Sequence, residues 1–231
     1  FITLLILLVY RIGCYIPVPG ISASTFSDYI ADGSNNFLTL MSAVTGGALA
    51  NGTLFALGIG PYINASIIVQ LLCVGIPALE RLSKQGEEGK KKISQITRFL
   101  TLLLAIIQSV GIILAFGNSA LTPQYFWNQE WLLWIFMIVV YSAGAMLTMW
   151  LGERITEYGV GNGISLLIFL GIISTAATTL INTFISAFEG GEFTFTPILQ
   201  IIIFVVLSVI IFALIVTVDL SERRIPVQYA K

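Results

Sequence analysis

The chain has 231 residues, of which 57% are apolar and 10% are charged; its mean hydropathy is +0.94 and its formal net charge is -1. These values exclude an ordinary soluble domain and predict an integral membrane protein. Histidine, the commonest general base and metal ligand, is absent, and Cys14 and Cys73 lack metal-ligand spacing. We therefore expect no metal site, and we interpret both cysteines as small buried side chains.

About 20 apolar residues are needed for a helix to cross the roughly 30 Å hydrocarbon core. By this criterion we expect an all-α polytopic membrane protein with about six spans. They cover approximately residues 1–18, 52–76, 97–117, 131–151, 164–185 and 197–218. The first run lacks the basic start and small-residue cleavage site of a signal peptide, so we interpret it as a retained helix. Because the sequence opens inside this run and stops after a basic segment, we expect it to be trimmed at both ends.

The first span contains Arg11. A charge at the bilayer centre costs about 2.5–3.5 kcal/mol on insertion scales, so this side chain must snorkel, pair or face the bundle interior. Pro17, Pro19 and Gly20 end the helix soon after and place Arg11 near the outer interface. We favour snorkelling or helix packing over a role in substrate binding.

A second apolar piece, FLTLMSAVTGGALANG, is too short to cross a membrane. Its apolar residues recur at helical spacing, and Gly46-Gly47 ends the pattern. These apolar residues are Phe37, Leu38, Leu40, Met41 and Val44. A short helix tucked back into the protein from outside fits this pattern, and an amphipathic helix lying at the outer interface is the open alternative.

The stretch from Gly46 to Leu72 is long and apolar but repeatedly broken. Glycines, a proline and two asparagines interrupt it: Gly52, Gly58, Gly60, Pro61, Asn51 and Asn64. Irregular backbone at membrane depth is tolerated only where protein or a water-filled cavity satisfies its polar groups. We therefore expect this stretch to face a pathway.

The basic residues set the expected orientation. Apart from Arg11, all Lys and Arg residues lie in 81–98, at Arg154 and in 223–231, whereas the loops between hold acids only. The positive-inside rule then places these three segments, and the N-terminus, in the cytoplasm. We interpret residues 80–98, ERLSKQGEEGKKKISQITR, as a solvated loop.

The later spans differ in character. Gln108 and Ser109 give the third span polar groups that favour a helix neighbour or a cavity over lipid. The fourth is flanked by an aromatic belt, Trp127, Trp131, Trp134 and Trp150, typical of scaffold. The sixth is uniformly apolar.

Alternating glycines at 159, 161 and 163 precede the fifth span. A phosphate-binding loop would need a preceding β-strand, which this chain does not offer, so we reject a nucleotide site. Asn162 is instead a candidate helix cap or gate residue.

Five segments occur in a recognisable order and spacing. They are RIGCYIPVPG (11–20), GGAL with FALGIGPYINASIIVQLL (46–72), GKKKISQITR (89–98), WLGERITEYGVGNGIS (150–165) and ERRIPVQYAK (222–231). Together they resemble the SecY family of protein-conducting channels. The resemblance implies a ten-helix channel of two pseudo-symmetric halves. This chain would hold helices 1–5 (1–185), helix 6 (197–218) and the start of the cytoplasmic loop 6–7 (219–231).

The resemblance also implies site residues. Residues 38–50 would form a plug that includes Leu38, Met41, Val44, Gly46, Gly47 and Leu49. A hydrophobic pore ring would comprise Ile59, Ile63, Ile164 and Ile168. The lateral gate, where a signal sequence is recognised, would include Asn64, Ile67, Ile68 and Gln108. Arg223, Arg224 and Lys231 would contact a cytoplasmic partner.

The residues themselves are compatible with a ring. Ile59 and Ile63, like Ile164 and Ile168, are separated by four positions, so each pair projects from one helix face with stiff β-branched side chains. Packing or lipid contact is the ordinary role of such isoleucines. Two departures from the family pattern are Gly60, where Met is expected, and Val160, whose place in the ring is open.

The implied partners are SecE- and SecG-type small subunits, a ribosome and/or SecA motor, a signal peptide or nascent chain, and the lipid bilayer, with ribosomal RNA as a further contact of the basic loops. No catalytic residue and no cofactor is expected. The implied location is a bacterial plasma membrane or a cyanobacterial or plastid thylakoid membrane. A secondary transporter with a broken-helix midplane site is the alternative, and an intramembrane enzyme is disfavoured because no nucleophile lies beside a base.

Overall fold

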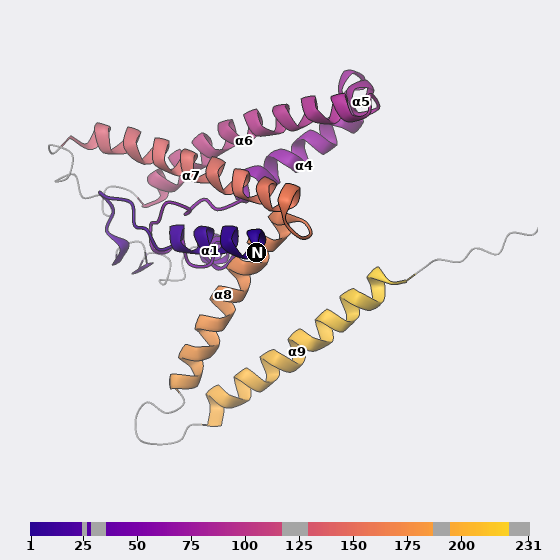
Figure 1. The fold of residues 1–231 in the computed structure, drawn as a ribbon. Helices are drawn as coiled ribbons and strands as arrows, with labels where there is room; N and C mark the ends of the chain where they lie inside the picture. Colours follow the sequence, from indigo (N-terminus) through magenta and orange to yellow (C-terminus); the bar gives the residue numbers. More distant parts are fainter. Residues whose placement is uncertain (25–26, 29–35, 117–128, 187–194, 222–231) are drawn as a thin grey trace, which may run out of the picture. The chain divides into compact units, whose positions relative to one another are not determined.

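The computed structural model describes residues 1–231 except 25–26, 29–35, 117–128, 187–194 and 222–231. The named elements of the described residues are all helices (Figure 1). They are α1 (Ile2–Gly13), α3 (Asn36–Val44), α4 (Gly60–Gly75), α5 (Pro77–Ser83), α6 (Glu87–Phe116), α7 (Glu130–Tyr158), α8 (Gly163–Ser186) and α9 (Phe195–Asp219). The chain divides into two units, Phe1–Thr175 and Ala176–Lys231, and the boundary falls within α8.

Four helices of the described residues are long and apolar enough to cross a membrane. They lie within α6, α7, α8 and α9. The pair α4 and α5 would add a fifth span, but it is bent by 106° at Ile76. The expected all-α, multi-pass class is therefore confirmed, and four of the about six predicted spans, or five with the bent pair, meet the criterion of length and composition among the described residues.

The first two predicted spans are shorter than expected because their facing ends pair with each other. α1 has 12 residues and ends at Gly13 instead of continuing to Val18. Val18 N–H donates to Gly52 O (3.1 Å) and Leu54 N–H donates to Ile16 O (3.1 Å) around an antiparallel bridge between Pro17 and Thr53. This extended pairing removes the residues near position 53 from any helix.

Glycine conformation also delays the start of α4. Gly52 and Gly58 have φ values of +56° and +53°, which an L-residue rarely adopts. The predicted helix from about residue 52 was therefore wrong at its start: regular helix begins at Gly60, with Pro61 in its first turn, where proline is tolerated.

The basic segment 80–98 is mostly helical, which corrects its interpretation as a loop. α5 covers Pro77–Ser83, a turn with Gly86 at φ +75° follows, and α6 begins at Glu87. Glu87 and Glu88 occupy the first turn of α6, where negative charge is favoured by the helix dipole. The positive charges of 90–92 thus extend a membrane helix beyond its apolar part.

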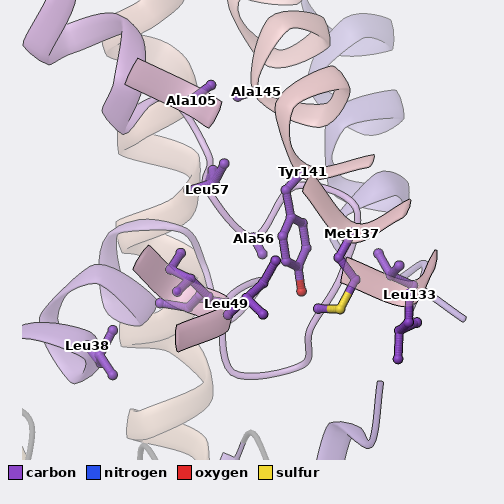
Figure 2. Packing of buried hydrophobic residues seen from close by; sticks show 12 residues of the cluster. Leu38, Leu49, Ala56, Leu57, Ala105, Leu133, Met137, Tyr141 and Ala145 are labelled. Carbon is purple, nitrogen blue, oxygen red and sulfur yellow. The ribbon is translucent and has the colours of Figure 1, made fainter. Parts of the chain in front are cut away.

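α7 is the scaffold of the first unit. Its buried side chains recur with helical period from Leu133 through Met137 and Tyr141 to Ile155. Figure 2 shows Tyr141 beside Ala56 of the segment between α3 and α4, with Leu49 of that segment nearby. In Figure 1, α6 lies alongside α7 and α4. The irregular segment is therefore packed against helices rather than exposed to lipid.

One ion pair joins α6 to α7. Arg98 meets both carboxylate oxygens of Glu153, with Nε–Oε1 at 3.1 Å and Nη2–Oε2 at 2.8 Å. The forked geometry fixes the two helices at this level, although half of the Arg98 side chain is exposed and solvent screens the pair.

The substitution Gly144→Ala should destabilise the protein. A Cβ at Gly144 would collide with the backbone oxygen of Leu54, so α7 would have to move away from the irregular segment. Overpacking of this kind should lower the melting temperature of the purified full-length protein by roughly 2–10 °C. Gly111 in α6 has open space around it, so Gly111→Ala is the matched control and should keep or raise the melting temperature. Equal melting temperatures for the two variants would contradict the close packing.

Candidate functional site

The short helix α3 ends as its glycines predict. Gly46 and Gly47 have φ values of +69° and +83°, and the Gly47 N–H donates back to Ser42 O (2.9 Å). Reversed hydrogen bonds of this type satisfy the last carbonyls of a helix. The expectation that Gly46-Gly47 stops the helix is confirmed.

The end of α3 rests on α8. Thr175 Oγ1 donates to Ala43 O at 2.9 Å. A Cβ at Gly171 would collide with Val44 O, so the two backbones touch because Gly171 has no side chain. The helix is therefore held by direct backbone contact and not only by its apolar side chains.

Arg11 reaches the same place from α1. Its Nη1 donates to Gly46 O (3.1 Å) and its Nη2 donates to Tyr15 Oη (2.8 Å). The guanidinium carbon also lies 4.7 Å from the centre of the Tyr15 ring. Of the two interpretations of Arg11, helix packing is the one that these contacts support.

The four isoleucines predicted as a ring belong to one apolar cluster. Ile59 is 6% exposed and lies in its core, with Phe55, Leu151 and Leu167. Ile63 from α4 and Ile164 and Ile168 from α8 are partly buried against that core. Ile59 is the residue just before α4, so only the Ile164 and Ile168 pair lies wholly within one helix, but all four side chains meet in the same cluster.

An apolar cavity of about 100 Å³ joins this cluster to α3. Met41 and Val44 of α3 line it together with Ile59, Ile63 and Ile168. Among the side chains that line it, only Tyr10 and Thr45 carry a hydroxyl. A buried water is stable where it finds two or more polar partners, and this lining offers few of them.

The start of α8 is fixed by two caps. Asn162 Oδ1 accepts hydrogen bonds from the N–H groups of Ile164 (3.0 Å) and Ser165 (3.4 Å), and Thr156 Oγ1 accepts one from Gly163 (2.9 Å). The prediction of Asn162 as a cap is confirmed. The caps fix the first turn of α8, which carries Ile164.

The residues predicted at a lateral gate lie mostly on one side of α4. Its buried stripe is formed by Pro61, Ala65 and Val69. Asn64, Ile67 and Ile68 are exposed on the remaining surface. Gln108 in α6 has a buried Oε1 with no hydrogen-bond partner among the described residues.

Some predicted residues do not join the site. Val160 is 78% exposed; its N–H donates to Thr3 Oγ1 (3.2 Å). Leu38 and Leu49 of the predicted plug lie in the other core cluster, with α7. Arg223, Arg224 and Lys231 lie outside the described residues.

Sequence reasoning missed the contacts that hold α3 in place. Gly171 and Thr175 sit in an unremarkable apolar span, and a single sequence does not reveal that their partners are backbone atoms of 43–46. The available signal was Arg11, whose charge requires a partner within a membrane helix.

The family model described as SecY matches residues 53–231 of the chain. The chain belongs to the SecY family. Similar SecY relatives include the protein translocase subunit SecY of Pseudomonas aeruginosa, 41% identical over 227 residues that make up 98% of the chain and 50% of the relative. The subunits of Escherichia coli K12 (40% identity over 228 residues, 97% and 50%) and Streptomyces galbus (41% over 238 residues, 99% and 53%) are comparably similar. The chain spans about half the length of the curated SecY relatives that it matches.

The variant Asn162→Ala should loosen the first turn of α8. Losing the cap costs about 1 kcal/mol, which corresponds to roughly fivefold faster hydrogen exchange at the Ile164 and Ser165 amides. Asn162→Asp retains the acceptor and should keep their protection, and the Gly163 amide, bound to Thr156, serves as an internal reference. Unchanged exchange at Ile164 and Ser165 in Asn162→Ala would contradict the capping role.

Proposed function

We propose that this chain is the N-terminal part of the central subunit of the Sec translocon, a passive channel that moves polypeptides across the membrane and releases signal sequences sideways into lipid. The observation that supports the proposal most directly is the shared cavity, because residues of α3 line it together with Ile59, Ile63 and Ile168. Family membership supplies the second support.

The proposed seal is a physical consequence of apolar lining. A narrow constriction lined by isoleucine side chains dewets and blocks ions and water, whereas an extended polypeptide can push the side chains apart. α3 covers the same space from one side and adds a removable barrier. The energy for transport would come from a bound ribosome or SecA motor, since the sequence offers no nucleotide loop.

The exposed side of α4 suits the proposed lateral gate. Ile67 and Ile68 are 49% and 38% exposed, so they can present an apolar surface to a signal sequence. Small subunits of the SecE and SecG type, a signal peptide or nascent chain, and lipid are the proposed partners. A contact of Arg223, Arg224 and Lys231 with a cytoplasmic partner also belongs to this proposal.

The alternative, a secondary transporter, needs convergent polar or ionisable groups at its binding site. Among the side chains that line the described cavity, Tyr10 and Thr45 alone are polar, and neither is charged at neutral pH. This cavity therefore lacks the convergent polar groups that a transport site would need.

Removal of the seal should make the full-length protein leaky. Deletion of residues 38–50, or replacement of Ile59 and Ile164 with glycine, should raise the resting ion conductance in planar lipid bilayers, because each change opens a dry constriction to water. Replacement of the outward-facing Ile107, which is 57% exposed on α6, with glycine controls for helix weakening. Native conductance in both seal variants would show that neither segment closes a pore.

A translocating chain should lie beside the proposed gate. Photo-crosslinkers at Ile67 and Gln108 of the full-length protein should form adducts with an arrested, signal-bearing nascent chain. A crosslinker at Trp150, on α7, is the control position. Transport of a small solute without any adduct at Ile67 or Gln108 would instead support the transporter.

A further inference from the structure

We propose that Arg11 and Thr175 are positioning residues that hold the C-terminal end of α3 against α1 and α8 and thereby set how readily this helix leaves the cavity. The inference rests on the proposed function of α3 as a plug. It adds a specific role for two side chains outside the predicted plug, ring and gate.

Tyr15 orients the guanidinium group of Arg11. The Tyr15 hydroxyl accepts a hydrogen bond from Nη2 at 2.8 Å, and the Tyr15 ring lies 4.7 Å from the guanidinium carbon. The other terminal nitrogen, Nη1, is then free to donate to Gly46 O at 3.1 Å. A planar guanidinium can serve both partners at once, whereas an ammonium group offers a single nitrogen.

The positive charge of Arg11 lies where it stabilises the contact with α3. Gly46 lies just beyond the C-terminal end of α3, where the helix dipole carries partial negative charge and stabilises a cation. In surroundings of low dielectric a charge-assisted hydrogen bond is stronger than in water, and an unsatisfied partner is more costly. Displacement of α3 would remove one acceptor of Arg11 and expose Gly46 O.

Thr175 contributes a second, weaker anchor. Its hydroxyl donates to Ala43 O at 2.9 Å and lies 3.3 Å from Gly171 O in its own helix. When α3 departs, the hydroxyl retains the intrahelical acceptor, so little is left unsatisfied. The Arg11 contact should therefore dominate the hold on α3.

The end of α3 is packed too closely for a side chain at position 46. A Cβ at Gly46 would lie 2.8 Å from Arg11 Nη1 and 3.2 Å from Gly171 Cα, and φ at Gly46 is +69°. The end of α3 is thus enclosed between α1 and α8. Both anchors act on main-chain oxygens, and the helix can leave only by breaking them.

The test measures resting ion conductance of the full-length protein in planar bilayers. Arg11→Met should raise it about tenfold, the effect of losing one charge-assisted hydrogen bond. Arg11→Lys keeps the charge and one donor nitrogen and should retain most of the seal. Thr175→Val should raise conductance by about two- to fivefold. Thr183→Val, which removes a hydroxyl that donates to Thr179 O within α8, is the matched control with native conductance.

Measurements in a protein that lacks residues 38–50 separate the role of Arg11 from the proposed function of α3. When residues 38–50 are deleted, Arg11→Met should add no further leak, because its target is gone. The inference is overturned if Arg11→Met leaves the native seal intact while the deletion leaks, or if it adds leak in the deleted background. A deletion that does not leak would overturn the proposed function itself. If Arg11→Met does not accumulate, Thr175→Val is compared in the same two backgrounds.

Discussion

The architecture depends on the need of an irregular backbone to satisfy its own polar groups away from water. Between α3 and α4 the chain runs through fifteen residues, 45–59, without regular helix. Its amides and hydroxyls find internal partners: Thr53 N–H and Oγ1 both donate to Ala48 O, and Leu54 N–H donates to Ile16 O. At membrane depth each unsatisfied group would cost several kcal/mol. The pairing with the segment after α1 is therefore a condition for placing this backbone inside a membrane bundle.

Close backbone approach is the means by which the helices enclose that segment. Gly144 in α7 faces Leu54 O, Gly163 at the start of α8 faces Gly152 O, and Gly171 faces Val44 O. At each of these places a methyl group would collide with a carbonyl oxygen. Membrane helices associate largely through such contacts between small residues, because lipid tails compete with apolar side chains. Gly144 thus lets α7 lie against the irregular segment, Gly163 lets α8 lie against α7, and Gly171 lets α8 lie against the end of α3.

The sequence predicted the parts whose periodicity or capping is local. The ranges of α7, α8 and α9 agree with the predicted fourth, fifth and sixth spans within a few residues at most positions, and Asn162 caps α8 as its side-chain chemistry suggests. The prediction was wrong at the start of α4, because apolar composition does not reveal the β-bridge between Pro17 and Thr53. It was also wrong at residues 80–98, where a run of charged residues was interpreted as a loop although most of it is helical. The predicted ring side chains do meet in one apolar cluster. The hydrogen bonds that hold α3 could not be predicted from the sequence, because their acceptors are main-chain oxygens.

The use of main-chain acceptors determines which substitutions in α3 affect its anchoring. Ala43, Val44 and Gly46 meet their partners through carbonyl oxygens, which every amino acid carries. The recognition of α3 at this end is thus independent of its side chains, provided that it remains helical and ends in a left-handed turn. The side chains that make the two hydrogen bonds, Arg11 and Thr175, lie in α1 and α8, so a substitution in α3 leaves both acceptors in place as long as the helix and its terminal turn keep their backbone course.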